Sequence, residues 1–582
     1  MQFQVLERDG DPSAETPSPL LITSEVPDRG HYRLGRRLAV LLAVVVGLVV
    51  LGVLLYASSI HAAQGNSDGA TAILEGKALR DGNLTLNHWA LSLDSFWSVD
   101  VPLYAIAVLF AGVRPQLLHL VPTIVALGVI CVGVFIARLG RRGWSAVLAA
   151  GTVVVLVGFP TKELAANFLM GPLHVTTAFW CLLAFVALSR GHYGWAWLFG
   201  VGLLAFGMLG DFQAVVLGIV PVFLAGIVVA LRNRNWRAGA APMTAALASV
   251  VVAEVIRRIA LVIGTYFIAP ANPLASFHQM ALNIVGLLGY GADMFGVGIK
   301  SFSSVRESHL TELAHTLGLG LVLIAVSLAA IATVRSSATG VRSVRRRLRT
   351  GEAVVQKGEA SKDLDASRTW FDDVLVFGFF GACAIYVSLS LVSSSLYDRY
   401  LTSVVIFGSI LAARLMGRLA ETAGSGRSKA ALAGTALLVA TGYLATFASG
   451  LTASPPVQAS SALVSYLEGH HLSSGIGDYW SSSVVTVESS DAVVIRPVTT
   501  EPGTRYLGRY MRQTTSSWYA TGFEFFVYNT ALAWNSVDAQ TAAASFGPPL
   551  QVASVGTYRI LTWGHNLSVP DDGRFVKYVP TR

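Results

Sequence analysis

The chain is poor in charge for its length. Only 13% of its 582 residues are Asp, Glu, Lys or Arg, whereas soluble proteins contain about 25%. Hydrophobic residues make up 53% of the chain, and the mean hydropathy is +0.58. These values exclude an ordinary soluble protein and predict an integral membrane protein.

Cysteines and common chemical motifs are also scarce. Cys131, Cys181 and Cys383 all lie inside apolar runs, which argues against a disulfide framework or a cysteine zinc site. The sequence has no phosphate-binding GxxxxGK[ST] loop, no HExxH and no CxxC pair.

The net charge of +8 does not predict a nucleic-acid partner, because the basic residues cluster between apolar runs, with nine Lys and Arg from Arg335 to Arg368.

Long apolar runs give the expected topology. Eleven are long enough to cross about 30 Å of hydrocarbon; they lie near 38–60, 115–138, 143–159, 173–190, 193–209, 212–231, 242–264, 316–335, 372–394, 399–417 and 429–449. The first is too long for a signal peptide and is taken as a retained span. The Pro- and Ser-containing stretch before it, residues 1–28, is expected to be disordered.

A twelfth run, 99–113, has about 15 residues and decides the orientation. If it does not cross and the N-terminus is cytoplasmic, the basic clusters all face the cytoplasm, as the positive-inside rule requires. We therefore expect 99–113 to be an interfacial or re-entrant helix. The C-terminus then lies outside the cytoplasm, in a multi-pass plasma-membrane protein.

The composition changes after the last span. Residues 451–582 alternate short apolar runs, such as 483–487 and 492–495, with Gly, Pro and Ser turns, which predicts a soluble α/β or β-rich domain. The fold class is thus a mainly α, polytopic helix bundle with an extracytoplasmic α/β domain. Its expected parts are a cytoplasmic N-terminus (1–37), a membrane domain (38–450) with an outer loop at 61–114, and the C-terminal domain (451–582).

Asp68 is the first candidate for chemistry. It lies eight residues beyond the first apolar run, in Asn66-Ser67-Asp68-Gly69-Ala70. A carboxylate at the outer mouth of the first span could act as a general base on a substrate carried by a lipid. The alternative is structural, because Asp is a favoured N-cap and a helix over 69–78 would need one.

Cations that could hold a lipid phosphate come from two places. Arg257 and Arg258 interrupt the apolar run 242–264, although Glu254 at i−3 and i−4 could pair with both of them. Arg399 opens the penultimate span within Tyr397-Asp398-Arg399-Tyr400, where a side chain that reaches lipid headgroups is the alternative explanation.

Further polar residues fall in the expected outer segments and are candidates to line a substrate cavity. For each of them a structural role is the alternative. They are Asp94, Asp100, Lys162, Glu163, His174, Asp211 and His278.

The arrangement resembles the GT-C superfamily of multi-span glycosyltransferases, such as the protein O-mannosyltransferases and the aminoarabinose transferases of lipid A. The likeness rests on Asp68-Gly69-Ala70 after the first span, on Pro102-Leu103-Tyr104 opening the next helix, and on Arg399-Tyr400-Leu401. The resemblance implies a polyprenyl-phosphate sugar donor. Many members carry an adjacent acid pair, but here Gly69 follows Asp68, so Glu163 or Asp211 would have to supply the second acid for a divalent metal such as Mg²⁺ or Mn²⁺.

These observations favour an inverting transferase that moves a sugar from a polyprenyl-phosphate donor to a glycan or lipid acceptor of the cell envelope. Asp68 would be the base, and Arg257, Arg258 or Arg399 would hold the phosphate. The Ala-, Val- and Arg-rich composition suggests an actinobacterial source. The alternative function is a non-catalytic lipid or glycan carrier, or a scaffold whose C-terminal domain binds envelope polymer.

Overall fold

A computed structural model describes most of the chain. The described residues are 29–62, 65–92, 94–172, 174–189, 192–268, 274–298, 308–350, 362–390, 395–456, 458–532, 536–572 and 574–577. Residues 1–28, which are predicted to be disordered, lie outside them. The chain divides into two compact units, Met1–Val50 and Leu51–Arg582, and the candidate sites discussed below lie in the second.

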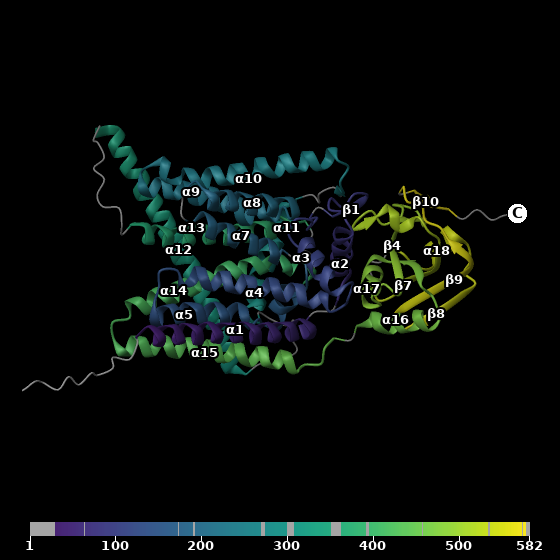
Figure 1. Cartoon of the computed structure of the whole chain (residues 1–582), viewed down its shortest axis with the longest axis horizontal. Coiled ribbons are helices and arrows are strands. Elements are labelled where there is room, and N and C mark those ends of the chain that lie inside the picture. The colour runs from purple at the N-terminus through teal and green to yellow at the C-terminus, as the bar shows by residue number, and fades with distance from the viewer. Residues whose placement is uncertain are drawn as a thin grey trace, which may run out of the picture. The chain divides into compact units, whose positions relative to one another are not determined.

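Helices dominate the described residues up to 452 (Figure 1). They are α1 (Arg29–Ala62), α2 (Ser67–Arg80), α3 (Val101–Ala111), α4 (Leu117–Arg138), α5 (Gly143–Val153), α6 (Lys162–Phe168), α7 (Val175–Leu188), α8 (Trp195–Gly210), α9 (Val220–Asn233), α10 (Trp236–Val262), α11 (Phe277–Met294), α12 (His309–Thr350), α13 (Lys362–Ser388), α14 (Thr402–Thr422) and α15 (Gly426–Thr452). Short turns η1 (Val154–Gly158), η2 (Val215–Ile219) and η3 (Ser395–Leu401) extend α5 or precede α9 and α14.

Seven helices among the described residues are long and apolar enough to cross a membrane, and a bent pair would make an eighth. The seven are Leu38–Ala62, Leu117–Arg138, Val215–Asn233, His309–Thr339, Thr369–Ser388, Asp398–Thr422 and Gly426–Thr452, and the bent pair is Gly143–Gly158 with Lys162–Phe168. A multi-pass membrane bundle is therefore confirmed, whereas the predicted count of eleven spans is not.

Three predicted spans, at 173–190, 193–209 and 242–264, are not among these helices. The predicted spans at 173–190 and 193–209 are α7 and α8, with 14 and 16 residues, less than the roughly 20 residues that cross a bilayer. The run 99–113 becomes α3, whose 11 residues rise only about 16 Å. Its length agrees with a helix that does not cross.

The C-terminal residues form an α/β fold, as predicted. Its helices are α16 (Ala459–Gly469), α17 (Tyr479–Glu488), η4 (Ser516–Tyr519) and α18 (Ala539–Phe546). Its strands are β3 (Ser474–Gly477), β4 (Val494–Thr500), β5 (Leu507–Arg509), β7 (Phe523–Asn529), β8 (Gln551–Val555), β9 (Tyr558–Leu567) and β10 (Phe575–Val576). They form one mixed sheet in the order β10-β5-β4-β3-β7-β9-β8, in which β3 is parallel to both β4 and β7.

The apolar run 483–487 is helical, not extended. It lies in α17, whose N-cap Asp478 accepts a hydrogen bond from the amide of Ser481. Val484, Val485 and Val487 are buried, and α17 packs against both β4 and α2. Burial on two sides outweighs the β-propensity of valine, which is a weak and context-dependent preference.

Two contacts tie the C-terminal fold to the bundle. Helix α2 lies against α17 on one side and α3 on the other, and Gly76 lets α2 approach Tyr104 closely, because a Cβ there would be 2.8–3.0 Å from the backbone and Cβ atoms of Tyr104 and Ala105. A small sheet joins β1 (Trp89–Leu91), β2 (Phe267–Ile268) and β6 (Thr514–Thr515). Three segments far apart in sequence thus meet beside α2.

Candidate active site

Asp68 lies in the first turn of α2. The helix is capped by Asn66, whose side chain accepts a hydrogen bond from the amide of Gly69 at 2.8 Å. Asp68 is therefore not the cap that the structural alternative proposed, and its carboxylate is available for other contacts. A negative charge in the first turn is also favoured by the helix dipole.

Two side chains from distant segments contact the Asp68 carboxylate. The Nη1 atom of Arg399 lies 3.7 Å from Oδ2 of Asp68, and the hydroxyl of Tyr479 donates a hydrogen bond to Oδ1. The side chains of Asp68 and Arg399 remain 22% and 27% exposed. A substrate can therefore reach both charges, which a fully buried ion pair would not allow.

Tyr479 enters this group from the start of α17. Its hydroxyl contacts the side-chain amide of Gln513 as well as Asp68, and its ring lies 4.9 Å from the ring of Tyr510. Burial, followed by the charge of Asp68, raises the pKa of Tyr479 well above its usual value. Tyr479 is thus a neutral hydrogen-bond donor at physiological pH.

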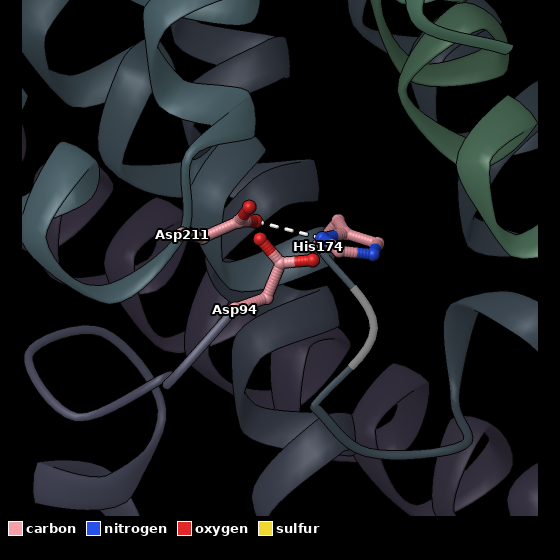
Figure 2. A group of neighbouring side chains, drawn as sticks. All are labelled: Asp94, His174 and Asp211. Atoms are coloured by element: carbon pink, nitrogen blue, oxygen red, sulfur yellow. Dashed lines mark hydrogen bonds and ion pairs between the residues drawn. The ribbon is translucent and has the colours of Figure 1, made fainter. Parts of the chain in front are cut away.

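A second polar group gathers Asp94, His174 and Asp211 from three separate segments (Figure 2). Nδ1 of His174 lies 2.7 Å from Oδ2 of Asp211. Thr177 donates to the same oxygen, and the amide of Gln213 donates to the other at 2.9 Å. The polar ends of all three side chains point toward one another.

The charges in this second group depend on one another. Burial and the Asp211 carboxylate raise the pKa of Asp94. Burial also opposes the charged forms of His174 and Asp211, but each charge stabilises the other, so the pKa of His174 is raised and that of Asp211 is lowered. The result is an ion pair between His174 and Asp211 beside a second, weakly acidic carboxyl group, that of Asp94.

Local backbone geometry holds His174 in place. It is the N-cap of α7 with φ of 69°, in the left-handed region, which non-glycine residues seldom adopt. Its ring stacks on Tyr400 at 4.8 Å between centroids and lies 5.6 Å from Phe96. Because Tyr400 follows Arg399 in η3, this stacking connects the second group to the Arg399–Asp68 pair.

Asp100 lies next to the second group. It is 3% exposed, and its Oδ1 accepts a hydrogen bond from Thr176 at 2.6 Å, while its Oδ2 has no hydrogen-bond partner among the described residues. Burial raises the pKa of Asp100 to about 7, although the Thr176 hydrogen bond opposes the shift. Asp100 is therefore a buried acid that is partly protonated at neutral pH.

The other candidate cations, Arg257 and Arg258, pair with Glu254, which is the structural alternative that the sequence left open. Arg257 and Arg258 both donate to Glu254, and their side chains are 50% and 74% exposed. They lie four and five residues before the end of α10 at Val262, which is about 6–8 Å along the axis. They are therefore near the C-terminal end of α10.

The remaining candidates lie outside both groups. Lys162 and Glu163 form the first turn of α6, and His278 is exposed near the start of α11. Among the described residues, none of these three has a hydrogen bond or ion pair with Asp68. Their assignment as cavity residues stays a prediction.

Sequence reasoning missed the partners that surround the candidates. Tyr479, Thr177 and Gln513 are not among the candidates that the sequence provides, and Tyr400 appears there only as a neighbour of Arg399. The signal for Tyr400 was present in Arg399-Tyr400-Leu401. No local pattern announces Tyr479 as a partner of Asp68, because the two are 411 positions apart.

Three solved structures resemble the chain at low sequence identity. The chain resembles the archaeal oligosaccharyltransferase AglB from Archaeoglobus fulgidus in complex with an inhibitory peptide and a dolichol-phosphate, at 11% identity and a TM-score of 0.42, covering 83% of this chain and 69% of that one. It also resembles ArnT from Cupriavidus metallidurans in the apo state, at 13% identity and a TM-score of 0.48, covering 90% of this chain and 98% of that one. For ArnT bound to undecaprenyl phosphate the identity is 13% and the TM-score 0.47, covering 91% of this chain and 99% of that one.

All three TM-scores lie below 0.5. The identities are low, so the likeness concerns the fold and assigns no residue a role. No protein-family model matches the chain, and no curated protein does.

Proposed function

We propose that this protein is a membrane glycosyltransferase that moves a sugar from a polyprenyl-phosphate donor to a hydroxyl of a cell-envelope acceptor. The observation that carries the proposal is the partly exposed ion pair of Asp68 and Arg399, to which the buried Tyr479 donates a hydrogen bond. It combines an accessible carboxylate with an adjacent permanent cation. Both are needed when a hydroxyl attacks and a phosphate leaves.

In the proposed reaction the acceptor oxygen attacks the anomeric carbon, and the bond from that carbon to the phosphate oxygen breaks. Asp68 takes the proton of the acceptor hydroxyl. The electron pair of the broken bond stays with the polyprenyl phosphate, whose negative charge Arg399 stabilises. A single displacement of this kind inverts the anomeric centre.

The hydrogen bond from Tyr479 supports the role of Asp68. The neutral hydroxyl of Tyr479 already donates to Oδ1 of Asp68, so this carboxylate accepts a hydrogen bond from a hydroxyl group in the folded chain. An acceptor sugar would bind Asp68 through the same kind of contact. Dolichol-phosphate and undecaprenyl phosphate, bound by the structural neighbours, are of the lipid class that we propose for the donor.

The test is Asp68→Asn in the full chain, purified in detergent and supplied with a panel of radiolabelled polyprenyl-phosphate hexoses and pentoses plus envelope glycan. Asn keeps the shape of Asp but cannot take a proton. We expect transfer to fall by about 10²–10⁴-fold. The matched control is Asp81→Asn, an exposed acid just after the other end of α2, which should transfer as the parent does. Equal transfer by Asp68→Asn and the parent would disprove the role of Asp68.

One observation favours the alternative function of a polymer-binding scaffold. The C-terminal fold carries an open depression of about 430 Å³. Its lining includes Tyr466, His470, Glu524, Trp563, His565 and Asn566. Aromatic, amide and acidic side chains together can bind a sugar. If the parent binds envelope glycan and shows no transfer with any donor of the panel, this alternative replaces the enzyme.

A further inference from the structure

The group formed by Asp94, His174 and Asp211 has the donor atoms of a metal site. One atom from each side chain, two carboxylate oxygens and an imidazole nitrogen, lies within 4.8 Å of both others. They come from the loop before α3, the start of α7 and the turn after α8, and Figure 2 shows their polar ends converging. Folding thus brings three possible metal ligands from separate segments to one place, as metal sites in proteins require.

Three carboxyl groups gather around one imidazole in this region. Asp94 and Asp211 face a single imidazole, and Asp100 adds a third carboxyl group nearby, buried and with one oxygen unpartnered among the described residues. Arg399 acts on His174, but it is already paired with Asp68. Buried carboxylates are costly unless a cation or protons neutralise them, so the region is suited to receive a cation.

The surrounding residues hold the ligands in position. Thr177 and the amide of Gln213 donate to the two oxygens of Asp211, and the rings of Phe96 and Tyr400 flank His174. Hydrogen bonds and packing of this kind orient metal ligands and are as much part of a metal site as the ligands. An incidental surface cluster of acids has no such support.

We propose that Asp94, His174 and Asp211 bind one divalent transition-metal ion of the Mn²⁺ or Zn²⁺ class. The nitrogen ligand favours this class over Mg²⁺ and Ca²⁺, which prefer oxygen alone. A metal about 2.0–2.2 Å from each ligand spaces neighbouring donors about 3.4 Å apart, so His174 and Asp211 separate slightly from their present 2.7 Å. The ion takes the place of the proton that these two residues share, and that proton is released to solvent.

The ion has a structural consequence for the proposed active site. Tyr400 stacks on His174, and Arg399 precedes it, so a metal that fixes His174 also fixes the last turn of η3, which carries Arg399. The proposal goes beyond the glycosyltransferase function and does not depend on it. Metal binding is measured without any transfer reaction, so the two proposals fail independently.

The test uses the full chain in detergent, stripped with a chelator, desalted and then titrated with Mn²⁺ or Zn²⁺. Free Mn²⁺ is followed by electron paramagnetic resonance, and bound Zn²⁺ by elemental analysis. We expect about one ion per chain. We expect binding to be at least about 10–100-fold weaker in Asp94→Asn and His174→Ala and unchanged in Asp81→Asn. Asp94 is the first choice because it is only half-buried and its replacement by Asn is conservative.

A measurement on the parent alone guards against misfolded variants. Pulsed resonance of the bound Mn²⁺ should detect the coupling of one imidazole nitrogen, and a 100-fold excess of Mg²⁺ should not displace the ion. The proposal is overturned if the parent binds no ion, if the folded variants bind as the parent does, if no nitrogen coupling is seen, or if Mg²⁺ displaces Mn²⁺ readily.

Discussion

The Tyr479 hydroxyl donates a hydrogen bond to the Asp68 carboxylate across 411 positions of the chain. Asp68 lies in the first turn of α2 and Tyr479 in the first turn of α17. The bond therefore joins the starts of two helices, whose partial positive charges both favour a carboxylate between them. Through this contact the C-terminal fold reaches the proposed base directly.

Replacing Tyr479 by Phe should reveal what this bond contributes. Tyr479→Phe keeps the ring that packs on Tyr510 and removes only the donor. A hydrogen bond to a charged group contributes about 1.5–3 kcal/mol, so we expect the free energy of unfolding to fall by about that amount in denaturant titrations in detergent. Tyr506→Phe, in the same C-terminal fold, loses a hydroxyl that is not bonded to Asp68 and should change stability by less than about 0.5 kcal/mol. Equal effects of the two substitutions would show that the bond to Asp68 stabilises nothing.

Substitutions of Arg399 and of Arg257 should have different effects on KM for the donor. Arg399→Met removes the cation beside Asp68, and the loss of a charge-assisted contact to phosphate should raise KM for the donor by about 10–150-fold. Arg257→Met removes a cation that already pairs with Glu254 and is half exposed, so KM should stay within about twofold of the parent value. If Arg257→Met raises KM and Arg399→Met does not, the phosphate site lies on α10 and the assignment to Arg399 is wrong.

Composition and local patterns were enough to predict the kind of fold. Low charge and long apolar runs predicted the membrane bundle, and the loss of long runs after residue 450 predicted the α/β fold. The predicted count of eleven spans is not confirmed at α7 and α8, which are shorter than the apolar runs suggested, because hydropathy measures apolarity and not helix length. Both helices pack within the core of the bundle, where apolar residues are buried whether or not the helix crosses the membrane.

For the candidate site, too, the sequence identified single residues but not the contacts between them. Asp68 and Arg399 stand in short motifs and were found as single residues, but their pairing is a long-range contact that no local pattern contains. His174, Asp94 and Asp211 were each named without any expectation that they would meet. What brings them together is the packing of α7, α8 and the loop before α3, and this packing depends on the whole bundle.

Glu75 allows a test of how burial and the charge of Asp68 affect a neighbouring acid. It lies two turns further along α2, on the same face, and is 2% exposed with Oε1 unpartnered among the described residues. Burial, followed by the charge of Asp68, raises the pKa of Glu75 well above its usual value. The folded chain thus keeps a proton that the unfolded chain releases above pH about 4.3. Stability should fall as the pH rises from there to the raised pKa, by about 1.4 kcal/mol per pH unit.

Glu75→Gln cannot ionise and should remove this dependence. We expect the melting temperature of Glu75→Gln in detergent to match that of the parent near pH 4.5 and to exceed it by a margin that grows between pH 5 and pH 8. Glu468→Gln, an exposed acid on α16, should follow the parent at every pH. If the melting temperatures of Glu75→Gln and the parent change with pH in the same way across this range, Glu75 is not held protonated in the folded chain.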